Sequence, residues 1–140
     1  AYGQSKLANL LFTFELDRRA GAAGTALIAA AAHPGYASTH LQAAGPEMAG
    51  HRLRAKVMEA GNRLFAQPDA QGALPQLYAA TMLDVRGGQV FGPDGLFQQQ
   101  GSPERVGTSR KSKRVDDARR LWEVSAELTG VSYPWPGATP

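Results

Sequence analysis

The apolar positions of residues 2–20 recur every three or four places, which is the period of an α-helix. This stripe consists of Leu7, Leu10, Leu11 and Phe14. Phe12 and Leu16 widen the apolar surface beyond one narrow face, and a helix with such a surface is usually buried on several sides. Gly21 and Gly24 predict the end of the helix, because glycine commonly terminates a helical pattern.

A short, continuous apolar run over residues 25–32 follows this helix, between Gly24 and the pair Pro34-Gly35. Its length and its flanking Gly and Pro residues favour a buried strand of a parallel sheet, although its alanines are poor strand formers. After a loop, residues 47–65 have the pattern of a moderately amphipathic helix.

The pattern from residue 69 to residue 95 predicts a helix and then a strand. We expect Asp69 to cap a helix whose first turns are disturbed by Pro75. Its apolar face would consist of Leu74, Leu77 and Tyr78. Residues 89–91 then read as a short strand between the turns at residues 87–88 and 92–95.

The last third of the chain predicts a polar loop, one helix and a tail. Residues 98–114 are polar and loop-like. A helix is expected to begin at Asp116 or Asp117 and to end at Gly130, and residues 132–140 are expected to form a frayed tail.

This order of elements is typical of an α/β fold, in which helices cover both faces of an open sheet. Two predicted strands are too few for a stable open sheet. The chain also has no initiator Met. We therefore expect residues 1–131 to be the C-terminal portion of a single domain, carrying the last two strands and their flanking helices, with its N-terminal half missing.

The composition excludes several classes of protein. A length of 140 residues allows one domain at most, and the absence of Cys excludes disulfides, a thiol nucleophile and Cys-based zinc sites. No apolar run is long enough to cross a bilayer, and no signal peptide is expected before the first helix. A cytoplasmic location is the expectation that fits these features. His40, Glu47 and His51 do not have the spacing of a compact metal site, so no metal is expected.

The formal net charge is +3, and seven of the 15 Lys and Arg residues lie between residues 105 and 120. They are Arg105, Arg110, Lys111, Lys113, Arg114, Arg119 and Arg120. Such a cluster could meet a phosphate, an acidic surface or a nucleic acid. The stretch lacks the interleaved aromatic residues and the recognition motifs of nucleic-acid sites, so a solvated loop leading into a helix is expected instead.

Candidate chemistry lies at the start of the chain, where Tyr2 and Lys6 are four residues apart. On a helix this spacing places both side chains on one face, one turn apart. An ammonium close to a phenol favours the phenolate, so such a pair can move a proton to or from a substrate oxygen. A lone Tyr-x-x-x-Lys match arises readily by chance, and its context decides what it means.

With that context, the chain resembles the short-chain dehydrogenase/reductase family, and within it the group similar to retinol dehydrogenases and the WW-domain oxidoreductase. Residues 2–9 (YGQSKLAN) look like the family's active-site helix, and His33-Pro34-Gly35 followed by Thr39 looks like its proline-glycine motif. Residues 88–95 resemble its last strand and turn, and residues 121–131 its C-terminal helix. The resemblance covers residues 1–131 and implies the C-terminal part of an NAD(P)-binding, Rossmann-type domain with a doubly wound parallel sheet.

The resemblance implies an NAD- or NADP-dependent oxidoreductase that interconverts an alcohol and a carbonyl. Tyr2 would be the acid/base, and Lys6 would assist its ionisation and bind the nicotinamide ribose. Pro34 and Gly35 would shape the loop under the nicotinamide. The backbone of Ala37 and the hydroxyl of Thr39 would hold the carboxamide or the pyrophosphate.

Two parts of the family's site are absent from this sequence. The Gly-rich phosphate loop and the catalytic Ser of the family precede the Tyr, and this chain contains neither; Ser5 does not replace that Ser, because it lies within the helix motif. The choice between NAD and NADP therefore rests on other residues. A small-molecule substrate, an apolar alcohol or carbonyl, is expected, and residues 40–65 occupy the place of the family's substrate lid.

Three alternatives stay open at this point. The chain could be a non-catalytic, truncated family member or an interaction fragment, or, with less support from its motifs, a sugar-nucleotide epimerase that shares the Tyr/Lys pair. The helix over residues 2–20 could form a homodimer interface or pack onto the missing half of its own sheet.

Overall fold

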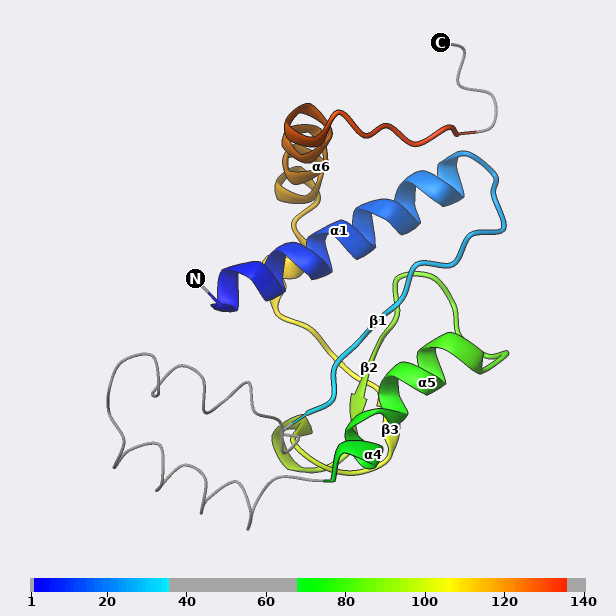
Figure 1. The fold of residues 1–140 in the computed structure, drawn as a ribbon, viewed down its shortest axis with the longest axis vertical. Helices are drawn as coiled ribbons and strands as arrows, with labels where there is room; N and C mark the ends of the chain where they lie inside the picture. Colours follow the sequence, from blue (N-terminus) through cyan, green and yellow to red (C-terminus); the bar gives the residue numbers. More distant parts are fainter. Residues whose placement is uncertain (1, 36–67, 136–140) are drawn as a thin grey trace. The chain divides into compact units, whose positions relative to one another are not determined.

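The computed structural model describes residues 2–35 and 68–135, and these fall into two compact units (Figure 1). The first unit contains the described residues up to 31, residues 82–90 and the described residues from 107 onward. The second unit contains residues 32–35, 68–81 and 91–106. The fold is mixed α/β, as the sequence predicts.

The first unit is built on two helices that pack against each other, α1 (Tyr2–Ala22) and α6 (Val115–Thr129) (Figure 1). Both helices confirm the sequence prediction. The α1 helix continues through Gly21, and Gly24 follows it in the left-handed region with a φ of 64°. Gly130 caps α6 with a φ of 67°, and its N–H donates to the Ala126 carbonyl.

The contact between these helices covers one side of α1. Leu11, Glu15 and Ala20 are the fully buried residues of α1, and residues 2–6 are exposed. The expectation that its wide apolar surface is buried on several sides is therefore not met within the described residues. The physical reason is that α6 and the short 3-10 helix η2 (Arg110–Lys113) are the elements that pack closely on α1.

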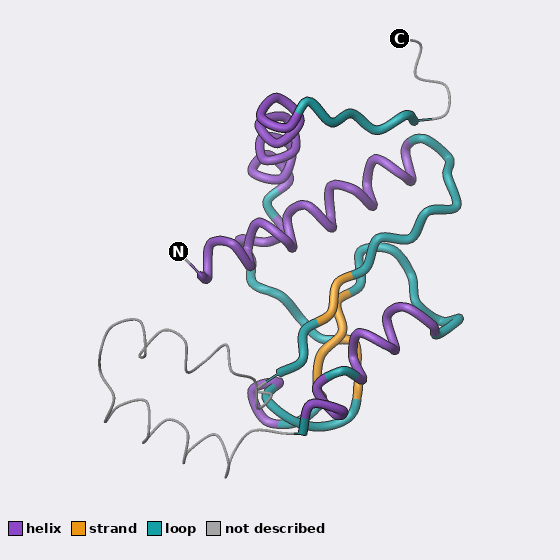
Figure 2. Tube along the Cα trace, in the orientation of Figure 1, coloured by secondary structure: helices purple, strands orange, loops and turns teal. Residues whose placement is uncertain are grey.

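The sheet has three described strands in the order β1-β2-β3 (Figure 2). They are β1 (Ala31–Ala32), β2 (Val90–Pro93) and β3 (Pro103–Arg105). The β2 and β3 strands are antiparallel, with Phe91 opposite Arg105 and Pro93 opposite Pro103. The sequence predicts two strands and a loop over residues 98–114. This prediction is wrong, because the described residues form a third strand, β3, within that loop. A three-residue strand that carries Pro, Glu and Arg has the composition of an exposed edge strand, which polarity alone cannot distinguish from a loop.

The strand predicted over residues 25–32 is also corrected, because only its last two residues form β1. Leu27 is 45% exposed and Ile28 is 59% exposed. Pairing with the segment that leads into β2 begins only at Ala29, whose carbonyl accepts from the Gly88 N–H. β1 is the first strand in the described order, so it has a neighbouring described strand on one side only. The residues before it therefore have no described strand on the other side to pair with.

Two helices precede β2 where the sequence predicts one, α4 (Asp69–Gly72) and α5 (Leu74–Thr81). Asp69 is the first residue of α4 rather than its cap, since Pro68 occupies the cap position and makes no side-chain bond there. Pro75 has no N–H to donate and is buried in the first turn of α5, which accounts for the break. The Tyr78 ring lies against Phe91 of β2, with ring centroids 5.1 Å apart.

Several expectations concern residues outside the described part of the chain. These are the helix over residues 47–65, the lid over residues 40–65 and the end of the tail from residue 136. In the described ranges, none of the helices combines the length and the hydrophobicity that a membrane span needs. The dimer contact through residues 2–20 and the cytoplasmic location stay predictions.

Candidate active site

Tyr2 and Lys6 lie on the first two turns of α1, and their side chains meet as the four-residue spacing predicts. The Lys6 Nζ atom is 5.3 Å from the centroid of the Tyr2 ring. Tyr2 is 66% exposed and Lys6 is exposed as well. The Ser5 hydroxyl donates to the Tyr2 carbonyl at 2.8 Å, so Ser5 is bonded to the backbone of its own helix. A phenol and an ammonium are thus presented together on an accessible helix end.

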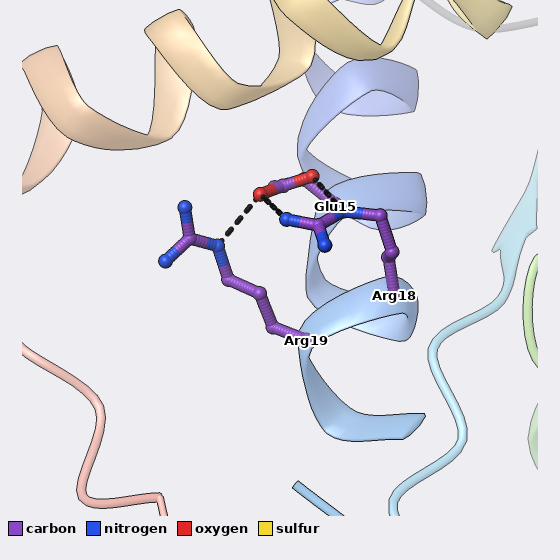
Figure 3. Close-up of polar contacts among 3 residues, drawn as sticks. All are labelled: Glu15, Arg18 and Arg19. Carbon is purple, nitrogen blue, oxygen red and sulfur yellow. Dashed lines mark hydrogen bonds and ion pairs between the residues drawn. The ribbon is translucent and has the colours of Figure 1, made fainter. Parts of the chain in front are cut away.

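A buried carboxylate stabilises the other half of α1. The Glu15 side chain is only 1% exposed and accepts hydrogen bonds from Arg18 and Arg19 (Figure 3). Arg18 donates through Nε at 2.8 Å and Nη2 at 2.6 Å, and Arg19 donates through Nε at 2.7 Å. Burial raises the pKa of Glu15, but the hydrogen bonds and charges of both arginines outweigh it and leave that pKa below its ordinary value.

Arg19 also connects α1 to α6, because its guanidinium lies 4.8 Å from the Trp122 ring centroid. Phe12 stacks on Trp122 at 5.2 Å with an interplanar angle of 13°. Tyr133 and Trp135, which follow α6, lie 4.9 Å and 6.5 Å from the same ring. Trp122 is therefore the centre of an aromatic and cationic cluster that fixes α1 against α6.

The His33-Pro34-Gly35 segment belongs to the second unit and is held there by contacts of its backbone and of the His33 ring. The His33 N–H donates to the Phe91 carbonyl at 2.9 Å. The Gly35 N–H donates to Nδ1 of His33 at 3.2 Å. The second ring nitrogen of His33, Nε2, lies 3.1 Å from Oε1 of Gln98 at the end of the 3-10 helix η1 (Leu96–Gln98).

Two glycines are required by this geometry. Gly35 has a φ of 68°, and a Cβ atom there would overlap the carbonyl of Gln99 and the ring of Pro93. A Cβ atom at Gly92 would overlap the imidazole of His33. A glycine within a strand often marks the close approach of another group, so Gly92 was a sequence signal for this contact. The sequence indicates His33 only as part of the proline-glycine motif, and it does not predict the role of Gln98.

The predicted site residues that the structure describes are divided between the two units. Tyr2 and Lys6 lie in the first unit, and Pro34 and Gly35 lie in the second. Ala37 and Thr39, the other two predicted cofactor-binding residues, are outside the described residues. Within the described ranges, no group of His, Asp and Glu side chains could hold a metal ion.

The chain is similar to several dehydrogenases, although no family model matches it. It is 32% identical to mouse retinol dehydrogenase 12 over 95% of its own length and 37% of that protein. It is 35% identical to human retinol dehydrogenase 13, over 96% of the chain and 38% of that protein. Human polyprenol dehydrogenase is 32% identical over 94% of the chain and 36% of its own length.

A solved structure is also similar, the crystal structure of an uncharacterized protein from Mycobacterium paratuberculosis. The match has a TM-score of 0.68 at 40% identity and covers 96% of this chain and 40% of that one. The chain thus spans somewhat more than a third of the length of the relatives it matches. Over nearly all of its own length, it belongs to the short-chain dehydrogenase/reductase family, beside the retinol and polyprenol dehydrogenases.

Proposed function

We propose that the protein is an NAD(P)-dependent oxidoreductase that interconverts an alcohol and a carbonyl, with Tyr2 as its acid/base. The observation that supports this most is the pair at the start of α1. An exposed phenol has an ammonium 5.3 Å from its ring, in a chain homologous to oxidoreductases. Tyr2 would donate its proton to the carbonyl oxygen during reduction and remove the proton from the alcohol during oxidation. Lys6 would stabilise the negative charge on the phenolate oxygen.

The donors on this chain fit the nicotinamide end of the cofactor. The Lys6 ammonium carries three N–H donors on an accessible helix face, which suits a pair of ribose hydroxyls. Pro34 and Gly35, held by the contacts of His33, would form a fixed loop for the nicotinamide, with Ala37 and Thr39 following it. The sequence has no G-x-G-x-x-G motif, so residues outside it would hold the adenosine phosphates. When bound, the nicotinamide supplies or accepts the hydride.

An apolar alcohol or carbonyl is the substrate class that we propose. The named relatives are retinol and polyprenol dehydrogenases, and both names denote long, apolar alcohols. The proton transfer needs only the oxygen of such a molecule, which Tyr2 can reach from an exposed helix end.

The decisive experiment replaces Tyr2 in the full-length protein as encoded. Tyr2→Phe keeps the ring and removes only the hydroxyl, so turnover should fall by about 100-fold or more while nucleotide binding is retained. Tyr133→Phe is the matched control, since it removes the same group from the aromatic cluster around Trp122. Turnover of Tyr2→Phe within a few-fold of the wild type would refute the role of Tyr2.

A non-catalytic role is the second candidate. The chain spans 37% of retinol dehydrogenase 12 and lacks the phosphate loop of a complete dinucleotide site. The coding DNA upstream of Ala1 separates the two candidates. An open frame that encodes a Gly-rich loop and a catalytic Ser supports the enzyme, whereas a stop codon directly upstream supports the non-catalytic role.

A further inference from the structure

We propose that His33 is a positioning residue, whose neutral imidazole fixes the Pro34-Gly35 loop between β2 and η1 and releases it when the imidazole is protonated. The proposal depends on the proposed function only where it concerns nucleotide affinity. The conformational part, that His33 holds the loop, depends on contacts within the second unit alone.

The hydrogen bonds determine which ring nitrogen carries the proton. The Gly35 backbone N–H can only donate, so Nδ1 of His33, 3.2 Å away, must accept and carries no hydrogen. The hydrogen of the neutral ring is therefore on Nε2, which donates to the Gln98 amide oxygen at 3.1 Å. One imidazole thus connects the loop that follows β1 to the turn that follows β2.

The position of the ring is fixed by the strand beneath it. The backbone N–H of His33 is bonded to the Phe91 carbonyl of β2, and the ring lies directly against Gly92. Gly35 is in the left-handed region, and the carbonyls of Gln98 and Gln99 fill the space beside its Cα. The loop therefore cannot shift toward η1, and its contact with the ring is the one that can open.

Gln98 is held in a conformation that presents its amide to the ring. Its φ is 57° and that of Phe97 is 54°, a region that residues with a Cβ atom rarely adopt. The Gln98 N–H donates to the Gly95 carbonyl at 2.9 Å, which closes the turn. The β2–β3 connection thus places a hydrogen-bond acceptor for the His33 ring in a disfavoured backbone conformation, as expected for a residue with a positioning role.

Protonation would break one of the two bonds. An imidazolium donates from both nitrogens, so its Nδ1–H would face the Gly35 N–H, and two donors repel each other. Among the described residues, β2 and η1 carry no charged side chain that could compensate. Asp94 accepts from the Ser102 N–H through Oδ1, and Glu104 and Arg105 on β3 are exposed. Protonating the ring would therefore release the loop from its contact with His33.

The test measures nucleotide affinity between pH 7.5 and pH 5.5 in the full-length protein as encoded, with NADH and NADPH as probes. Loss of one hydrogen bond should weaken the wild type by about threefold to tenfold on acidification. His33→Asn places a carbonyl oxygen where Nδ1 was and does not titrate, so its affinity should change by less than about twofold. Gln98→Glu places a carboxylate beside Nε2 and should move the fall to higher pH.

Gln71→Glu is the matched control for Gln98→Glu, because it makes the same substitution at an exposed position of α4. It should keep the wild-type pH profile. A flat wild-type profile, or an unchanged fall in His33→Asn, would overturn the effect of protonation on the loop.

A second readout separates this proposal from the proposed function. Nitrogen NMR of the His33 ring, without nucleotide, should show the hydrogen on Nε2 at neutral pH, and acidification should move the Gly35 amide signal as the ring titrates. A hydrogen on Nδ1 would refute the proposal even if the protein is an active dehydrogenase. A protein that binds neither nucleotide but shows the expected ring signals would refute the proposed function and leave the positioning role of His33 supported.

Discussion

The two units hold their candidate functional residues by different means. In the first unit, side chains far along α1 provide the anchoring, through Glu15 and the contacts of Trp122, and the end that carries Tyr2 stays exposed. In the second unit, the candidate loop itself is held, by hydrogen bonds of the His33 backbone and ring and by the conformation of Gly35. A substitution in the first unit should therefore change either stability or catalysis, whereas a substitution in the second unit should change both.

The largest effect should come from Trp122, at the centre of the first unit. Trp122→Ala removes a buried ring that contacts Phe12, Arg19 and Tyr133, and such truncations cost about 3–5 kcal/mol in unfolding free energy. Chemical denaturation of the full-length protein measures this. Val124→Ala, at a 38% exposed position of the same helix, is the control and should cost well under half as much. A loss below about 1 kcal/mol for Trp122→Ala would show that the anchoring lies elsewhere.

A pair of glycines tests whether backbone geometry dominates the second unit. Gly35→Ala and Gly24→Ala both place a Cβ atom at positive φ, 68° and 64°, but only Gly35 has atoms in the way. The conformational penalty should be about 1 kcal/mol at both sites, and overpacking should add about 1–3 kcal/mol at Gly35. Thermal and chemical denaturation compare the two variants directly. Equal losses of unfolding free energy in the two variants would mean that the atoms around Gly35 move aside at little cost.

The same difference explains which features could be predicted from sequence. The helices α1 and α6 were predicted because the spacing of residues such as Leu7 and Leu11, and the glycine at position 130, follows local rules. The third strand was missed, because Pro103 to Arg105 becomes a strand only through its pairing with Phe91 to Pro93. Tyr2 and Lys6 were predicted to meet, since one helix sets their distance. The contact of His33 with Gln98 joins positions that no local pattern relates.

Glu15 should contribute a smaller, pH-dependent stabilisation to the first unit. Its pKa is lowered in the folded protein, so the stabilisation is fully present above the ordinary titration range of glutamate. The stabilisation is lost as the pH falls through the pKa that Glu15 has in the folded protein. Glu15→Gln should therefore cost about 1–2 kcal/mol at neutral pH, and the difference from the wild type should shrink below about pH 4. Denaturation at a series of pH values measures it. Glu123→Gln, at an exposed position of α6, is the control and should cost less than about 0.5 kcal/mol.

The smallest effect on stability should come from Tyr2, the residue on which the proposed chemistry depends most. Tyr2→Phe leaves the ring beside the Lys6 ammonium, and no described residue makes a hydrogen bond to the hydroxyl that it removes. At a 66% exposed position the unfolding free energy should change by less than about 0.5 kcal/mol. Measured beside turnover, this result would assign the loss of activity to the missing proton and not to unfolding. A loss of more than about 1 kcal/mol would instead show that the start of α1 is part of the packed structure, as Trp122 is. The contrast between the exposed and the anchored half of α1 would then fail.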